Sequence, residues 1–262
     1  AELMAVIAKN CRVVSKARAA AAEVPVALDD FLRGGSCSEG SHWSASLLLP
    51  GTSAAKTPTP GPGFALWLGG ADDALDLAAL RHRGISAIVN MALAGCLEEQ
   101  ASMRAVASRY GALTTDCKTW QQADFTADWY GKSLASDDFQ YLAINAQDRP
   151  DFPISESFDE VEAFLRRCQA AERAVLVHCM QGINRSAAVC ASFLARSQGL
   201  DPELGSCEVM GVRRAVDWIS QRRHGVLSNT GFLHQLVVHG APEAPWDSEV
   251  PLEAGDEEEE AA

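Results

Sequence analysis

The sequence of 262 residues contains no run of 18 apolar residues, which excludes a membrane-spanning helix. It also lacks a Cys-x-x-Cys pair, which argues against a zinc ribbon or a thioredoxin-type redox site. Its eight cysteines are too few for a disulfide scaffold and indicate a reducing compartment. With 47% apolar and 22% charged residues, the composition is that of a globular protein with a sizeable core.

Positive charge is scarce as well. Lys and Arg number 22 against 35 acidic residues, a formal net charge of −13. Nine of those acids follow residue 242, where no Lys or Arg occurs, so the remaining body carries 22 − 26 = −4. A nearly neutral body without a basic stripe argues against nucleic-acid binding. We expect residues 242–262 to form an acidic disordered tail.

The region before residue 64 has the composition of a poorly packed segment. Residues 1–28 can form a helix, and residues 33–63 are rich in Gly, Ser, Thr and Pro, which predicts a flexible linker. The Ala-rich, basic residues 1–22 loosely resemble an organelle transit peptide. We expect the cytoplasm or the nucleus, and organelle targeting stays open.

The folded domain is expected over residues 64–241, where apolar runs alternate with helical patterns. The runs predict strands at 65–68, 85–89, 139–144 and 174–177. The helical patterns cover 72–81, 96–110, 155–167 (N-cap Ser155), 186–196, 206–221 and 229–239. This alternation predicts an α/β fold with a mainly parallel sheet of about four to five strands and helices on both faces.

Residues 95–137 form a long connection, and residues 112–137 have no clean period. Trp120, Trp129 and Tyr130 lie there among polar residues. They could line a cleft, but aromatic side chains are more often packed in a core. We therefore expect them to pack.

One short stretch carries chemistry: residues 175–186 read VLVHCMQGINRS. Cys-x5-Arg occurs three times in the chain, at Cys179, Cys190 and Cys207. Only Cys179 follows a predicted strand and precedes a predicted helix, where loop N–H groups and a helix N-terminus create an anion site. We interpret Cys190 and Cys207 as packing residues.

The residues around Cys179 fit the same interpretation. Gly182 provides the backbone freedom of a tight loop, and the planar guanidinium of Arg185 can bind two phosphate oxygens. The positive field lowers the pKa of Cys179, so that a thiolate exists near neutral pH. We expect a loop that is open to solvent, with the sulfur within reach of a bound dianion.

The segment His178-Cys179-x5-Arg185-Ser186 resembles the signature of the cysteine-dependent protein phosphatases, and its surroundings are similar to the dual-specificity branch. The resemblance extends over about 64–241 and includes the opening residues 66–69 and the closing residues 228–236. It implies a phosphatase-type loop between strand and helix and a reaction that uses neither metal nor cofactor. We do not expect an N-terminal regulatory domain of the kind found in MAP-kinase phosphatases, and the resemblance is therefore to an atypical small member of the family.

The resemblance also implies roles for individual residues. Cys179 is the nucleophile, Asp148 is the general acid (with Asp151 as a competitor), and Ser186 assists breakdown of the phosphocysteine. His178 orients the loop, and Asn229 either braces the loop from behind or caps the last helix. The phosphate-binding residues are Met180, Gln181, Gly182, Ile183, Asn184 and Arg185.

The implied function is hydrolysis of phosphotyrosine and phosphoserine/threonine in a protein substrate, and the oligomeric state stays open. Residues 182–185 also resemble the loop of the RNA 5′-triphosphatases, which is the leading alternative. A phosphoinositide phosphatase ranks lower because Arg185 is the sole basic residue of the loop. A module that binds phosphorylated partners without turnover predicts loss of Cys179 or of the acid, and both are present.

Overall fold

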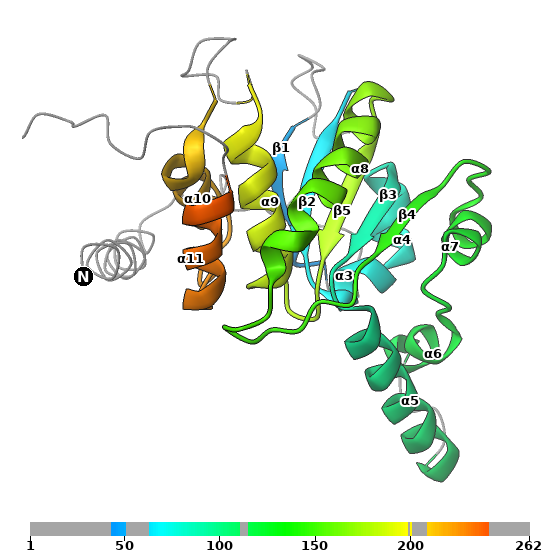
Figure 1. Ribbon diagram of the computed structural model, residues 1–262. Helices are drawn as coiled ribbons and strands as arrows, with labels where there is room; N and C mark the ends of the chain where they lie inside the picture. Colours follow the sequence, from blue (N-terminus) through cyan, green and yellow to red (C-terminus); the bar gives the residue numbers. More distant parts are fainter. Residues whose placement is uncertain (1–42, 51–62, 111–114, 199, 201–208, 241–262) are drawn as a thin grey trace, which may run out of the picture.

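The computed structural model describes residues 43–50, 63–110, 115–198, 200 and 209–240. Its centre is a five-stranded sheet in the order β1-β2-β5-β3-β4 (Figure 1). The strands are β1 (Ser46–Leu49), β2 (Ala65–Gly69), β3 (Ile85–Asn90), β4 (Gln140–Ala143) and β5 (Ala174–His178). β2, β5, β3 and β4 run parallel to one another and β1 is antiparallel to β2, which confirms the predicted α/β fold.

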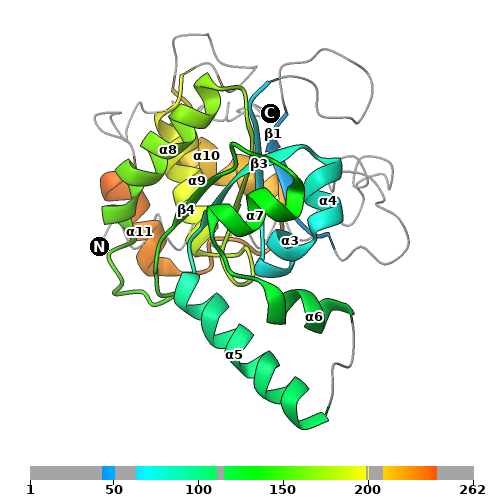
Figure 2. The ribbon, with the colours of Figure 1, turned by 90° about the vertical axis from the view of Figure 1, so that its right-hand side faces the viewer.

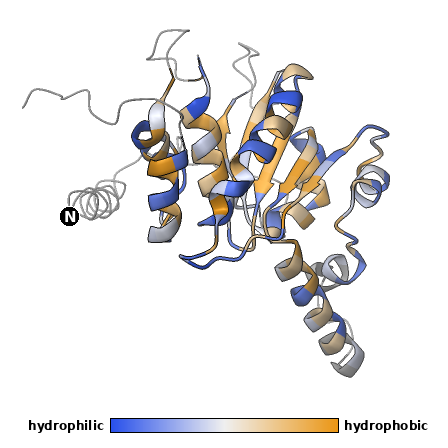
Figure 3. Cartoon of the chain, in the orientation of Figure 1, coloured by the Kyte–Doolittle hydropathy of each residue, from blue (hydrophilic) through white to orange (hydrophobic). Residues whose placement is uncertain are grey.

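The sheet is covered on both faces, which explains why its central strands read as continuous apolar runs (Figure 3). Val175 and Val177 of β5 belong to a core shared with α8 (Phe158–Ala170), α9 (Arg185–Arg196), α10 (Gly211–Arg222) and α11 (Thr230–His239). Leu176 faces a second core, with α4 (Leu77–His82) and α7 (Ala127–Leu134). Figure 2 shows the two groups of helices on opposite sides of the sheet.

The first strand lies inside the predicted linker, so that prediction is wrong for residues 46–49. Leu48 is fully buried, and its carbonyl oxygen accepts a hydrogen bond from Trp218 Nε1 at 3.0 Å. A short apolar triplet can add an edge strand even between Gly- and Pro-rich stretches, because β2 and α10 supply its partners. The helix expected within residues 1–28, the acidic tail and Cys207 lie outside the described residues.

Several predicted helix bounds differ from the structure, and two of the differences have a clear cause in hydrogen bonding. The helix expected over 72–81 is two helices, α3 (Ala71–Leu75) and α4, because the Asp76 carboxylate between them accepts the Ala79 N–H at 2.9 Å. A 3₁₀ turn at Ile154–Ser157 precedes α8, so Ser155 is not its N-cap. The Ser155 N–H instead donates to Gln235 Oε1 at 3.0 Å.

The long connection after β3 is helical. It comprises α5 (Leu93–Tyr110), α6 (Thr115–Gln122) and α7, of which α5 and α6 project from the domain as an arm (Figure 2). Trp120 and Tyr130 are buried, and the Trp129 ring lies edge-on to Tyr130 at 4.8 Å between centroids. These residues pack, as expected.

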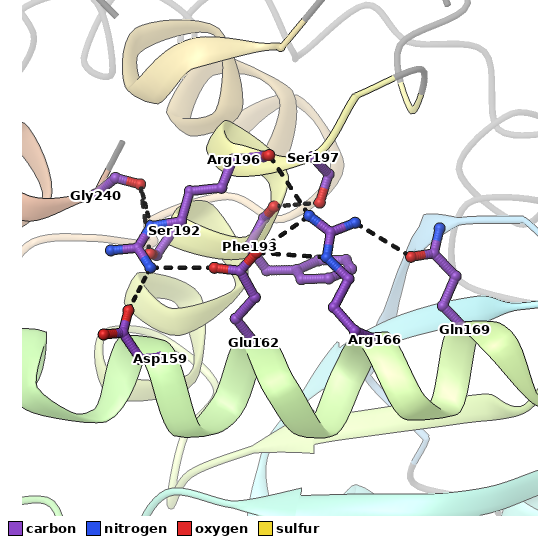
Figure 4. A network of polar contacts seen from close by, with 9 residues as sticks. All are labelled: Asp159, Glu162, Arg166, Gln169, Ser192, Phe193, Arg196, Ser197 and Gly240. Atoms are coloured by element: carbon purple, nitrogen blue, oxygen red, sulfur yellow. Dashed lines mark hydrogen bonds and ion pairs between the residues drawn. The ribbon is translucent and has the colours of Figure 1, made fainter. Parts of the chain in front are cut away.

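Arg196 links the C-terminal end of α11 to α8 (Figure 4). Its Nε donates to Gly240 O at 3.0 Å, and its Nη1 contacts Asp159 at 2.5 Å and Glu162 at 3.1 Å, both on α8. A cation at a helix C-terminus binds the last free carbonyls and complements the helix dipole. The anchored helix begins directly after Asn229, so this network also positions one side of the site described next.

Candidate active site

The loop of residues 179–184 joins β5 to α9 at the carboxyl ends of the parallel strands, where ligands bind in open α/β sheets. His178 is paired with Gly69 of β2 on one side and with Asn90 of β3 on the other. By contrast, Cys190 lies within α9, fully buried, and burial raises the pKa of its thiol. The structure thus distinguishes the Cys179 motif from the repeat of its spacing at Cys190.

The backbone of this loop is oriented by donors outside it. Each carbonyl of residues 180–183 accepts a hydrogen bond from elsewhere in the protein. Because N–H and C=O point in opposite directions across a trans peptide, this turns the N–H groups of residues 181–184 toward the loop interior. The donors are Ala71 N–H on Met180 O (3.0 Å), Arg223 Nη2 on Gln181 O (3.1 Å), Arg223 Nε on Gly182 O (2.8 Å) and Leu227 N–H on Ile183 O (2.9 Å). The result is a ring of amides of the kind that binds anions.

The Cys179 sulfur is surrounded by hydrogen-bond donors. It accepts the Gly182 N–H at 3.2 Å and the Ser186 hydroxyl at 3.3 Å. Burial alone would raise the pKa of this thiol, but hydrogen bonds from Ser186 and the charge of Arg185 outweigh burial and lower the pKa below its usual value. The prediction of a stabilised thiolate therefore agrees with the geometry.

One part of the sequence-based prediction is wrong. Cys179 is only 1% exposed, so the sulfur is enclosed and not open to solvent. The loop that supplies the N–H donors folds closely around it, and a close ring of donors leaves little surface. Any chemistry at Cys179 must take place at the bottom of an enclosed loop.

Gly182 is required by this close fit. Its φ is +68°, a left-handed conformation, and a Cβ at this position would lie 2.4 Å from the Gly69 carbonyl oxygen. The same Cβ would lie 2.7 Å from Arg223 Nη2. The predicted need for glycine at this position is confirmed, and β2 is what imposes it.

Arg185, the first residue of α9, has a donor available for an anion. Its Nη1 donates to Ala146 O at 3.1 Å, whereas its Nε is buried without a partner among the described residues. A buried N–H without an acceptor costs free energy, and a phosphate oxygen would provide the acceptor.

His178 is buried behind the loop, with its Nδ1 3.2 Å from Cys179 O. Burial lowers the pKa of His178 to about 4, so the ring is neutral at physiological pH. The contact lies on the peptide that carries Cys179, and the role of His178 in orienting the loop stays a prediction.

Asp148 approaches the loop from the segment after β4. Its Oδ2 accepts the Asn184 amide at 3.1 Å, and its Oδ1 accepts the Asn229 amide at 2.9 Å. Asp151, the competing acid, instead pairs with Arg149 at 3.0 Å, and both side chains are exposed. Of these two carboxylates, Asp148 is the one that contacts the loop of residues 179–184.

Asn229 makes contacts in two directions, one to α11 and one to Asp148. Its Oδ1 caps α11 by accepting the N–H groups of Gly231 and Phe232, while its Nδ2 holds Asp148. The approach of this helix to the Asp148 segment is close, since a Cβ on Gly231 would overlap the Pro150 carbonyl. Asn229 therefore contacts Asp148 through its side chain and the loop directly through its main-chain N–H, which donates to Asn184 Oδ1 at 3.1 Å.

Two charged residues that sequence reasoning missed lie beside the site: Arg223 holds the loop itself, and Asp73 holds the segments that flank it. Besides its two loop carbonyls, Arg223 donates from Nη1 to Ser44 O at 2.7 Å. Buried Asp73 accepts the N–H groups of Ala45 at 3.0 Å and Gly70 at 2.7 Å, and burial raises its pKa. Arg223 lies 41 residues from Gly182 in the chain, so no local pattern connects them.

The remaining loop side chains have separate environments. Met180 packs against Cys96 at the base of the arm, with 3.7 Å between the sulfurs, and the Gln181 side chain is exposed. The residues that the structure describes contain no cluster of three or more His, Cys, Asp or Glu suited to a metal ion. Within the same residues, no helix has the length and apolar character needed to cross a membrane.

Comparison with known families agrees with this arrangement. Residues 114–241 match the model of the dual specificity phosphatase catalytic domain, and this range includes every site residue from Asp148 to Asn229. The chain contains a dual-specificity phosphatase domain. The resemblance that begins at the Cys179 motif is therefore confirmed at the level of the family.

Individual relatives match part of the chain. Dual specificity protein phosphatase 1B of Arabidopsis thaliana is 32% identical over 100 residues, which are 38% of this chain and 54% of the relative. Human dual specificity protein phosphatase 13B is 34% identical over 119 residues, 45% of this chain and 52% of its own. A crystal structure of DUSP15 has 23% identity over 69% of this chain and 84% of that chain, with a TM-score of 0.45. The chain spans about half the length of the curated relatives it matches.

Proposed function

We propose that this domain hydrolyses phosphotyrosine and phosphoserine/threonine in protein substrates through a phosphocysteine on Cys179. The observation that carries the proposal is the sulfur of Cys179, held by the Gly182 N–H and the Ser186 hydroxyl inside a ring of amides. A nucleophile of lowered pKa beside inward-facing N–H groups is suited to attack on a bound dianion.

The first step forms a sulfur–phosphorus bond as the phosphorus–oxygen bond to the substrate breaks. Arg185 and the loop amides bind the equatorial phosphate oxygens, on which charge accumulates. Asp148 donates its proton to the departing oxygen, so that an alcohol or phenol leaves instead of an anion.

The second step reverses the proton transfer. Asp148, now a carboxylate, accepts a proton from water as the water oxygen attacks phosphorus. The sulfur–phosphorus bond breaks, inorganic phosphate forms and Cys179 leaves as a thiolate. The Ser186 hydroxyl, 3.3 Å from the sulfur, stabilises the negative charge that returns to it.

The leading alternative, removal of the γ-phosphate from RNA 5′ ends, was suggested by the Asn184–Arg185 pair. In the structure the Asn184 amide contacts Asp148, a use that needs no RNA substrate. A strong preference for 5′-triphosphate RNA over phosphopeptides would overturn the proposed substrate class.

The proposal is tested by hydrolysis of an aryl phosphate in EDTA. We expect Cys179→Ser to abolish turnover and Asp148→Ala to reduce turnover of a phosphopeptide by about 100-fold or more. Asp151→Ala is the matched control because Asp151 lies on the same segment and pairs with Arg149. Activity that survives Cys179→Ser, or equal losses for the two aspartate variants, would contradict the proposal. A protein that captures phosphopeptides without Cys179-dependent turnover would be a binding module.

A further inference from the structure

The side chain of Asn184 links the loop of residues 179–184 to Asp148, the proposed general acid. Its Oδ1 accepts the Asn229 N–H and the Ser228 hydroxyl, both at 3.1 Å, and its Nδ2 donates to Asp148 Oδ2 at 3.1 Å. We propose that Asn184 is a positioning residue that holds Asp148 in the orientation from which it transfers protons. This inference rests on the proposed function, because it assigns a role within the same reaction.

Asp148 needs such a contact because its side chain is exposed and lies outside the helices and strands. An unrestrained carboxylate there would sample several rotamers, few of which face a bound substrate. Asn184 and Asn229 each occupy one carboxylate oxygen, at 3.1 and 2.9 Å. Each oxygen has room for two partners, so the acid can still carry its proton toward the leaving group.

The side chain of Asn184 is not needed to cap α9. Asn184 occupies the N-cap position, but its side chain makes no capping hydrogen bond. Its neighbour in the chain, Arg185, has the buried Nε that fits a phosphate oxygen. The order Asn184-Arg185 thus places the anchor of the acid and a phosphate-binding donor on adjacent residues. Asn229 is less informative as a test, because it also caps α11.

The experiment compares two aryl phosphates that differ in their need for an acid. 4-Nitrophenyl phosphate has a good leaving group, whereas phenyl phosphate has a poor one and depends on protonation. The readout is the ratio of kcat/KM for the two substrates, since kcat/KM reports on formation of the phosphocysteine. We expect Asn184→Ala to lower kcat/KM for phenyl phosphate by about tenfold more than for 4-nitrophenyl phosphate.

Further variants separate positioning from folding and from phosphate binding. Asn184→Asp keeps the volume and the Oδ1 acceptor but replaces the donor that faces Asp148, and it should change the ratio at least as much. If Asn184→Ala does not fold, this variant decides alone. In an Asp148→Ala background, Asn184→Ala should leave the ratio unchanged. Gln140→Ala is the matched control, because it removes an amide-to-aspartate contact, to Asp138 at 2.7 Å, away from the site.

The outcomes distinguish this inference from the proposed function. If hydrolysis does not depend on Cys179, the proposed function fails. If hydrolysis depends on Cys179 but the Asn184 variants keep the wild-type ratio, the positioning role alone is wrong. A uniform loss on both substrates would also contradict it, since that pattern marks a residue that only binds phosphate.

Discussion

Replacement of Gly182 by alanine tests how closely the loop must fit. An L-residue at φ +68° costs about 1–2 kcal/mol relative to glycine. The added Cβ would lie 2.4 Å from the Gly69 oxygen, whereas ordinary contact begins at 3.4 Å, so the loop must move by about 3.4 − 2.4 = 1.0 Å. Overpacking of this kind costs about 1–3 kcal/mol, which gives a total loss of about 2–5 kcal/mol in the free energy of unfolding.

The loss of activity should exceed what this loss of stability explains. A 1 Å displacement of reacting groups costs about 100-fold in rate, and the Gly182 N–H is also a donor to the Cys179 sulfur. Urea unfolding and kcat/KM on an aryl phosphate measure the two effects separately.

Gly84→Ala is the matched control for this substitution. Gly84 has φ +63° with nothing within 4 Å of an added Cβ, so it carries the conformational cost without the clash. Gly84→Ala should lose about 1–2 kcal/mol and keep its activity. Wild-type kcat/KM in Gly182→Ala, or equal effects of the two variants, would refute the reasoning.

Three further predictions concern the residues that hold the loop. Ser186→Ala removes a hydrogen bond to the sulfur, so the pKa of Cys179 should rise and the pH profile of its alkylation should move to higher pH; an unchanged profile would exclude Ser186 as a stabiliser of the thiolate. The pKa of His178 falls from 6.5 in the unfolded chain to about 4, so the unfolded state alone binds this proton between those values. Stability should fall by up to about 3 kcal/mol as pH drops from 6.5 to 4, and His178→Gln should remove this part of the pH dependence in denaturant titrations. Arg223→Ala leaves three main-chain carbonyls without their donor, so we expect a loss of at least about 2 kcal/mol in stability and weaker inhibition by inorganic phosphate; Arg223→Lys should not restore either, since an ammonium cannot reach all three.

Much of the fold could be predicted because its signals are local. The apolar run of β5 and the helical pattern of α9 are each continuous in sequence, and their order decides the loop between them. β1 was missed because its short apolar triplet is surrounded by Gly, Ser, Thr and Pro, and only pairing with β2 makes it a strand. The helix after Ser155 begins later than expected because the Ser155 N–H is bound by Gln235, 80 residues away.

The same distinction applies to the site. Cys179, Gly182 and Arg185 could be identified because their chemistry and their loop are contiguous in the sequence. The hydrogen bonds from Arg223 to the loop carbonyls, and those from the two asparagine amides to Asp148, join segments that are 36 to 81 residues apart. They depend on how the helices pack. The enclosure of the sulfur was missed for a related reason, since the spacing of a motif does not reveal how tightly the loop closes.

The central claim, that Cys179 is a thiolate which a phosphate dianion can reach, is tested most directly by alkylation of the folded protein. Burial raises the pKa of Cys96 to about 12 and that of Cys168 to about 11, so these two thiols serve as internal controls. At pH 7 we expect iodoacetate to modify Cys179 ahead of both, and inorganic phosphate to protect it, as read by peptide mass mapping. A Cys179 that stays unmodified while the protein is folded, or that reacts equally with and without phosphate, would contradict the account.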